Sequence, residues 1–310
     1  MYLIKPKFWE NRNSILSLIL LPLSMLFIFF VYFKKKLTKI VNYEIPVICV
    51  GNLYLGGTGK TPLSILIGNE LTKKGINPAI VRKFYKNHND EHQMLTKHFQ
   101  NNIFIRDRKS GIVEAIQRGF DTVILDDGLQ DYRIKKNFNI ICFNQKQLIG
   151  NGRVIPAGPL REDLSAVKDA SVILINGKKD HNFEKKIFYH NNNIDIFYSK
   201  YKFINFQKFE NKKLFAIAGI GNPENFFELI SKHGLNLKKK RAFPDHYEFE
   251  KSEIDEILDE AKNSDYKIIT TEKDYYRLDS DSKKKIEYAK IELEIENKDK
   301  FINKILSIYD

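Results

Sequence analysis

The chain has 310 residues, of which 43% are hydrophobic and 29% are charged. This balance is typical of a globular protein and excludes an intrinsically disordered chain, and the length fits one large or two modest domains. The net charge of +12 favours an anionic partner, such as nucleic acid, a membrane surface or a phosphorylated substrate. The alternative is that the basicity reflects a composition rich in Lys, Asn and Ile.

An uncharged apolar segment lies near the amino terminus, at residues 15–33. Its length is just sufficient for a helix to cross a hydrocarbon core of about 30 Å. Trp9 precedes it, and lysines follow it at Lys34, Lys35, Lys36 and Lys39, as at a membrane boundary with the rest of the chain in the cytoplasm. We therefore expect a membrane anchor helix within residues 1–40, which either spans the bilayer or lies in its surface. A cleaved signal peptide and a buried core helix are the alternatives.

From residue 44 the chain alternates short apolar runs with helical stretches, which predicts a mostly parallel α/β sheet. Strands are expected at 44–50, 78–82, 103–105, 122–125, 139–143 and 172–175, and helices at 62–73, 91–99 and 111–118. A second α/β set is expected from strands at 213–218 and 267–270 and helices at 224–233 and 252–262. The sequence thus predicts a larger domain at 41–205 and a smaller one at 206–310. Residues 177–211 carry no clear pattern.

The strongest local motif is GNLYLGGTGKTP at residues 51–62, where a strand enters a glycine-rich turn and then a helix. This order is typical of a P-loop, whose backbone N–H groups and helix N-terminus bind phosphate. The residues expected to bind ATP are Gly56, Gly57, Thr58, Gly59, Lys60 and Thr61. Lys60 is expected to reach the β and γ phosphates, and Thr61 to hold Mg²⁺. Tyr54 stands where the standard pattern has its first glycine.

Two adjacent acids, Asp126 and Asp127, follow an apolar strand in the motif DTVILDDGLQ. Carboxylates at this end of a strand beside a P-loop are typical Mg²⁺ ligands, although a helix cap is an alternative. Arg161 and Glu162 end the segment GNGRVIPAGPLRE, where arginine suits phosphate recognition and a simple helix start is equally compatible. His246 in FPDHYEF is a candidate proton carrier or an ordinary surface histidine. The motif TTEKDYYR at 270–277 follows a predicted strand and is typical of a capping box, with a charged turn as the alternative. The two cysteines, Cys49 and Cys142, lie in apolar runs and are expected to be buried thiols.

Taken in order, these motifs resemble the tetraacyldisaccharide 4'-kinase family. The matching segments are the apolar helix, GNLYLGGTGKTP, LDDGLQ, NGRVIPAGPLRE, AGIGNPENFF, FPDHYEF and TTEKD, which cover nearly the whole chain. The family commonly lacks the early P-loop glycine, so Tyr54 supports the resemblance. The resemblance implies a P-loop NTPase domain with a mostly parallel sheet, a smaller α/β domain and an N-terminal membrane helix.

The resemblance further implies transfer of the ATP γ-phosphate to the 4'-hydroxyl of an acylated glucosamine disaccharide 1-phosphate, which gives lipid IVA of lipid A biosynthesis. The enzyme would work at the cytoplasmic face of the bacterial inner membrane. It also implies an Asp general base supported by a His, which fall on Asp90 and His246 from different domains. Gln130 is carried over as an ATP-binding residue. Arg82, Arg161 and Glu162 are carried over as substrate-binding residues.

The chain departs from the family pattern at three places. VRKFYK replaces SRGYG around Arg82, NDEH replaces GDEP around Asp90, and Asp131 and Tyr132 precede Arg133 where HRR is common. An alternative function is a membrane-associated P-loop switch ATPase of the chromosome- or septum-positioning type. Such proteins usually carry a lysine where this chain has Leu55. A nucleic-acid-binding module is disfavoured because no nucleic-acid motif occurs.

Overall fold

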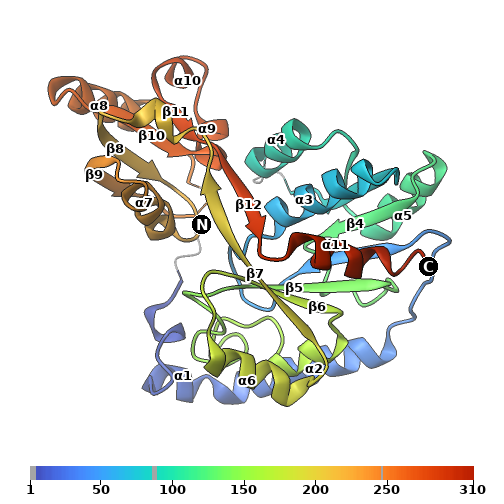
Figure 1. Cartoon of the computed structure of the whole chain (residues 1–310). Helices are drawn as coiled ribbons and strands as arrows, with labels where there is room; N and C mark the ends of the chain where they lie inside the picture. The colour runs from blue at the N-terminus through green and yellow to red at the C-terminus, as the bar shows by residue number, and fades with distance from the viewer. Residues whose placement is uncertain (1–4, 86–88, 246) are drawn as a thin grey trace. The chain divides into compact units, whose positions relative to one another are not determined.

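The computed structural model describes residues 5–85, 89–245 and 247–310, which form two compact units (Figure 1). The larger unit comprises Lys5–Phe84, Phe99–Lys200 and Glu294–Asp310, and the smaller unit comprises Tyr85–His98 and Tyr201–Leu293.

The larger unit contains a sheet that has eight strands among the described residues. These are β1 Val47–Gly51, β2 Pro78–Lys83, β3 Asn102–Ile105, β4 Thr122–Asp126, β5 Phe138–Asn144, β6 Val172–Asn176, β7 Asp195–Phe203 and β12 Ile291–Ile295. Their order in the sheet is β12-β7-β6-β5-β1-β4-β2-β3, and the pairs from β3 through β7 are parallel. The helices of this unit are η1 Lys7–Trp9, α1 Ile15–Ile19, α2 Leu21–Leu37, α3 Lys60–Lys73, α5 Arg108–Gln117, η2 Leu164–Asp169, α6 His181–His190 and α11 Lys298–Leu306.

Helices cover both faces of this sheet, as in a doubly wound fold. The central strands β1 and β4 are buried along their whole length, because parallel strands with helices on both sides have no solvent face. Ile112 of α5 and Phe183 of α6 belong to one apolar cluster with alternate residues of the strands. Figure 1 shows α3 on the opposite side of the sheet from α6. The mostly parallel α/β fold predicted from the sequence is therefore observed.

The central cysteines lie inside this layer, as predicted. Cys49 and Cys142 are free thiols with almost no exposed surface. Burial raises the pKa of Cys49 to about 11 and that of Cys142 to about 12, because a buried thiolate is poorly solvated. Both are therefore unreactive thiols of the core at neutral pH.

The smaller unit is built on a second parallel sheet, which has four strands among the described residues. Its order is β11-β10-β8-β9, from β8 Lys213–Ala218, β9 Asn236–Ala242, β10 Lys267–Thr271 and β11 Glu287–Ala289. Its helices are α4 Asn89–His98, η3 Phe206–Phe209, α7 Pro223–Lys232, α8 Lys251–Asn263, α9 Glu272–Arg277 and α10 Ser282–Lys285. Apolar residues of α7 and α8 pack in two clusters against its strands.

The two units differ from the predicted domain ranges in two segments. Residues 85–98 group with the smaller unit because α4 packs against α9. Residues 294–310 group with the larger unit, where Phe301 of α11 stacks edge-on against Phe197 of β7. The segment 177–211, in which no element was predicted, contains α6 and β7.

The apolar amino-terminal segment forms two helices instead of one. It divides between α1 and α2 at Leu20, and Pro22 lies in the first turn of α2, where its missing N–H and fixed φ are tolerated. Throughout the described residues, we find no helix that combines the length and the apolar character needed to cross a membrane. The single spanning helix suggested by the sequence is therefore not supported.

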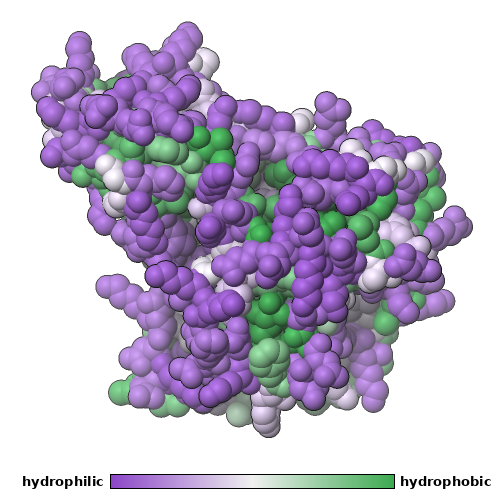
Figure 2. Space-filling view, viewed as in Figure 1, coloured by the Kyte–Doolittle hydropathy of each residue, from purple (hydrophilic) through white to green (hydrophobic). Residues whose placement is uncertain are grey.

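These two helices pack inward through serines and present apolar side chains to the outside. Ser17 and Ser24 are buried, and their hydroxyls donate hydrogen bonds to the carbonyls of Ala157 (2.6 Å) and Val154 (2.8 Å). The exposed large side chains include Ile15, Leu16, Leu18, Ile19, Leu23, Met25, Leu26, Phe29, Phe30 and Tyr32. Figure 2 shows apolar atoms at the lower edge of an otherwise mostly hydrophilic face, where α1 lies. We call this set the outer face of α1 and α2.

Candidate active site

The phosphate loop connects β1 to α3, as the sequence predicts. Two of its glycines have conformations that disfavour other residues, since Gly56 has a φ of 143° and Gly59, the residue before α3, has a φ of 89°. The side-chain amide of Asn52 donates to the carbonyls of Tyr54 (2.7 Å) and Gly56 (3.0 Å), which curls the loop. The buried hydroxyl of Thr58 has no hydrogen-bond partner among the described residues, which suits a phosphate-facing position.

A second segment, residues 153–161, supports this loop. The N–H of Leu55 donates to the carbonyl of Pro159 (2.9 Å), and the N–H of Arg161 donates to the carbonyl of Leu53 (2.7 Å). Tyr54 also pairs with Leu160 in an isolated bridge. The segment that the sequence singled out for arginine therefore has a structural role as well, because it holds the phosphate loop from the side.

The predicted Mg²⁺ ligands Thr61 and Asp126 lie together behind the loop. The hydroxyl of Thr61 donates to Asp126 Oδ2 (3.0 Å), and the hydroxyl of Ser64 lies 3.3 Å from Asp126 Oδ1. Asp126 ends β4 and is fully buried. Arg82 near the end of β2 joins them, because its Nη1 donates to Thr61 Oγ1 (2.9 Å) and pairs with Asp126 Oδ2. Arg82 thus contacts the metal candidates, and its part in substrate binding stays a prediction.

Asp127 lies beside Asp126 but faces a different set of groups. Its φ of 61° is unusual for a residue other than glycine, and the Arg108 guanidinium bonds to its carbonyl (2.6 Å). Its carboxylate is 3.5 Å from Lys60 Nζ and 2.9 Å from Arg161 Nη1. Burial alone would raise the pKa of Asp127, but these cations outweigh it and hold the pKa well below its usual value.

Lys60, the partner of Asp127 in this arrangement, is itself nearly buried. Its burial lowers the pKa of the ammonium group, and the nearby Asp127 carboxylate partly offsets that shift. The ion pair therefore holds a nearly buried lysine at the start of α3, next to the loop that would carry the phosphates.

Gln130 and Glu162 complete the same network. The Gln130 amide donates to Glu162 Oε1 (3.1 Å) and to the carbonyl of Asn52 (3.2 Å), and Arg161 Nη1 donates to Gln130 Oε1 (3.2 Å). The candidate residues of the larger unit therefore converge on the carboxyl ends of β1 and β4.

Two residues of the site, Asn52 and Arg108, were not predicted from the sequence. Their side chains donate hydrogen bonds to backbone carbonyls of the site. Asn52 directly follows the strand, but no signal in the sequence marks Arg108.

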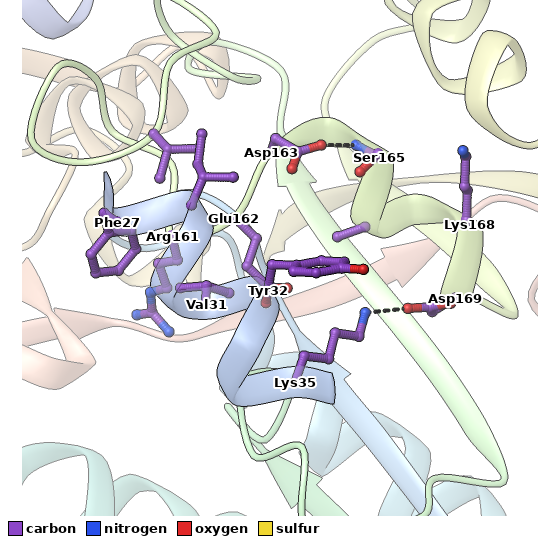
Figure 3. Close-up of a pocket in the computed structure, with 13 residues that line it drawn as sticks. Phe27, Val31, Tyr32, Lys35, Arg161, Glu162, Asp163, Ser165, Lys168 and Asp169 are labelled. Carbon is purple, nitrogen blue, oxygen red and sulfur yellow. Dashed lines mark hydrogen bonds and ion pairs between the residues drawn. The ribbon is translucent and has the colours of Figure 1, made fainter. Parts of the chain in front are cut away.

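A pocket of about 250 Å³ opens next to Arg161 and Glu162, between α2 and η2 (Figure 3). Phe27, Ile28 and Val31 of α2 form an apolar wall, and Figure 3 shows the Tyr32 ring crossing the pocket. Lys35 pairs with Asp169 (2.5 Å) at the far side. The pocket therefore combines an apolar side with charged groups in the immediate vicinity of the phosphate site.

Comparison with known proteins decides the family. The family model "Tetraacyldisaccharide-1-P 4'-kinase" matches residues 16–310. This chain belongs to that family. A tetraacyldisaccharide 4'-kinase from Pelagibacter ubique (strain HTCC1062) is 38% identical over 99% of both chains, and one from Rickettsia akari (strain Hartford) is 32% identical over 98% of this chain and 97% of its own. The "apo" form of LpxK from Aquifex aeolicus, in complex with ATP, shares the fold with a TM-score of 0.72 at 23% identity, covering 96% of this chain and 100% of that one.

The base predicted from the tetraacyldisaccharide 4'-kinase family lies in the smaller unit. Asp90 is in the first turn of α4, only 3% exposed, and it forms an ion pair with Arg277 of α9. The sequence had placed it in the domain of the P-loop, and its packing on α9 explains the difference. His246, the predicted partner of Asp90, lies outside the described residues. The catalytic roles of both residues stay predictions.

Proposed function

We propose that this chain transfers the γ-phosphate of ATP to the 4'-hydroxyl of tetraacyldisaccharide 1-phosphate, which gives lipid IVA of lipid A biosynthesis. The observation that carries the proposal is the phosphate loop with Lys60, Thr61 and Asp126 assembled behind it, in a chain of the tetraacyldisaccharide 4'-kinase family. The family does not favour the switch-ATPase alternative.

The larger unit would handle the phosphates of ATP. The backbone N–H groups of the loop and the N-terminus of α3 attract anionic oxygens, and Thr58 adds a buried hydroxyl. Lys60 would exchange its partner Asp127 for the β and γ phosphates. It is already largely removed from water, so little further desolvation opposes the exchange.

The residues present fit a Mg²⁺ ion. Mg²⁺ prefers hard oxygens and commonly takes only one or two from the protein, with phosphate and water supplying the others. Thr61 Oγ1 and Asp126 Oδ2 are such oxygens, 3.0 Å apart. When bound there, Mg²⁺ would neutralise charge on the transferred phosphoryl group. Between the two acids, Asp126 is favoured because its carboxylate lies beside the Thr61 hydroxyl, and the Arg82 guanidinium that pairs with the same oxygen would have to give way to the ion.

Asp90 would accept the proton of the sugar hydroxyl. A sugar hydroxyl is a weak nucleophile, so a carboxylate that takes its proton as the new P–O bond forms assists the reaction. The pocket between α2 and η2 supports binding of a lipid with a charged head group, because Phe27, Ile28 and Val31 line it together with Arg161 and Glu162. A lipid that carries sugar and phosphate groups needs both kinds of surface.

The outer face of α1 and α2 supports attachment to the bacterial inner membrane. Exposed apolar side chains on two consecutive helices exceed what a soluble surface usually carries, and Lys34, Lys35 and Lys36 follow them. We infer that the helices lie in the bilayer surface on its cytoplasmic side, where ATP is available. The acyl chains would then stay in lipid, since moving each methylene into water costs about 0.8 kcal/mol.

Replacing both Phe29 and Phe30 by aspartate is expected to reduce binding to vesicles of anionic lipid at least about tenfold, because each exposed ring loses roughly 1.5 kcal/mol or more of burial. The matched control is Phe188→Asp with Tyr189→Asp, two exposed aromatic residues on α6. Cosedimentation with the vesicles measures the fraction of each double variant that is bound. If both double variants bound the vesicles as well as the wild type, attachment through the outer face of α1 and α2 would be contradicted.

The function itself is tested by incubating the chain with tetraacyldisaccharide 1-phosphate in detergent micelles and ATP labelled at the γ-phosphate, with and without Mg²⁺. A labelled bisphosphate that forms only with Mg²⁺ is the expected result. Hydrolysis of ATP without label in the lipid would refute the proposed acceptor.

A further inference from the structure

The motif TTEKDYYR, which in the sequence is typical of a capping box and contains the family segment TTEKD, runs from the end of β10 into α9. Its α9 part contacts α4 through several ion pairs. Arg277 pairs with Asp90, Lys273 pairs with Glu91, and Glu272 lies 2.9 Å from His98 Nε2. Two adjacent carboxylates of α4 therefore meet two cations of α9. The residues in contact are more than 170 positions apart in the chain, so a local capping role does not explain them.

Arg277 is held by further hydrogen bonds through Nη1, the nitrogen that does not contact Asp90 in the pair with Oδ2. Its Nη1 donates to the carbonyl of Gly219 (2.8 Å) and to Asp274 Oδ1 (2.8 Å). Asp274 is fixed in turn, because its Oδ2 accepts hydrogen bonds from the Gly219 N–H (3.0 Å) and the Thr271 hydroxyl (2.6 Å). The side chains of Arg277, Asp90 and Asp274 are 8%, 1% and 0% exposed. The guanidinium therefore has its orientation set before it meets Asp90.

A general base of this kind must be ionised and correctly oriented when the hydroxyl arrives. Two buried carboxylates, Asp90 and Asp274, share the positive charge of Arg277. Without that charge, burial and mutual repulsion would favour protonation of one of them. The contact fixes one oxygen of the carboxylate, since Nη2 of Arg277 donates to Oδ2 of Asp90.

We propose that Arg277 is a positioning residue for the phosphoryl transfer, which keeps the Asp90 carboxylate charged and aimed through the contact between Nη2 and Oδ2. This inference rests on the proposed function, in which Asp90 is the base. Glu91 and His92 are the titratable neighbours of Asp90 on α4, and Lys273 and Asp274 accompany Arg277 on α9. His246 lies outside the described residues.

The test is a double-mutant cycle of Arg277→Gln and Asp90→Asn, with lipid phosphorylation followed across pH. In the wild-type background, Arg277→Gln is expected to lower kcat at pH 7 at least about tenfold and to move the acidic limb of the pH profile upward by about one unit. In the Asp90→Asn background, the same change is expected to alter kcat less than about twofold, because the group on which Arg277 acts is gone.

Arg277→Lys keeps the positive charge and replaces Arg277→Gln in the test if that variant does not fold. It is expected to leave the acidic limb near its wild-type position while lowering kcat through poorer geometry. Arg241→Gln is the matched control, since Arg241 also forms an ion pair in the smaller unit, with Glu260 (3.3 Å). It is expected to keep the wild-type pH profile and kcat.

The outcomes separate the inference from the function on which it rests. Additive losses in the cycle, or an Arg277→Gln variant that melts at a lower temperature but keeps the wild-type pH profile, would overturn the positioning role. A wild-type chain that does not label the lipid would refute the proposed function instead. An Asp90→Asn variant with full activity would remove the base assignment and the inference with it.

Discussion

Lys60→Ala is expected to reduce phosphoryl transfer by about 10³-fold or more, because it removes the positive charge that stabilises the developing charge on the transferred phosphate. The fold is expected to survive, since Arg161 stays 2.9 Å from the Asp127 carboxylate that Lys60 leaves behind. The measurement is labelled phosphate transferred to the lipid, together with the circular dichroism spectrum and the melting temperature of the variant.

Lys73→Ala provides the matched control for this change. Lys73 is in the last turn of the same helix α3, with a side chain that is 67% exposed and paired only at the surface with Glu70 (2.8 Å). Such surface pairs contribute little to stability, so activity and melting temperature are expected to stay near those of the wild type. Robust transfer by Lys60→Ala would show that the loop does not bind the phosphates as proposed.

Asp90→Asn is expected to lower kcat by roughly 10²- to 10⁴-fold, the usual contribution of a positioned general base. The affinity for ATP is expected to change less than about twofold, because the phosphate loop and Lys60 are in the larger unit. The amide keeps the shape of the side chain but cannot take the proton. Steady-state kinetics with the lipid and calorimetric titration of ATP separate the two quantities.

Asp259→Asn is the matched control, because it also removes a carboxylate from the smaller unit but at a position on the exposed side of α8. It is expected to leave both quantities unchanged. If Asp90→Asn bound ATP normally and kept its kcat, the base would have to be sought elsewhere. If both affinity and kcat fell together with the melting temperature, Asp90 would be a structural partner of Arg277 and not the base.

The phosphate site was predictable because its signals are local. A strand, a glycine turn and a helix follow one another in residues 51–62, and Asp126 and Asp127 directly follow a buried strand. In a parallel sheet the carboxyl ends of neighbouring strands lie at one edge, so these residues converge without further information.

The contacts that the sequence did not reveal depend on long-range packing. Nothing local indicates that α4 joins a unit formed mainly by residues 201–293, or that Arg277 pairs with Asp90 across 187 positions. The apolar segment was interpreted as one helix because hydropathy does not report the break at Leu20. Strand β7 was missed because Lys200 and Lys202 interrupt its apolar pattern where it becomes more exposed.

The serines on the inner side of α1 and α2 decide which changes could abolish membrane attachment without loss of activity. A chain that began after Leu37 would lose the serine hydroxyl donors to the carbonyls of Val154 and Ala157, which would keep only their bonds from the Gly158 N–H and the Asn151 amide. Those carbonyls belong to the segment that holds the phosphate loop through Leu55 and Pro159. Truncation would thus weaken the nucleotide site as well as the anchor. A water-soluble and active enzyme should instead be sought by exchanging outward side chains such as Met25 and Leu26 for polar ones while Ser17 and Ser24 are kept.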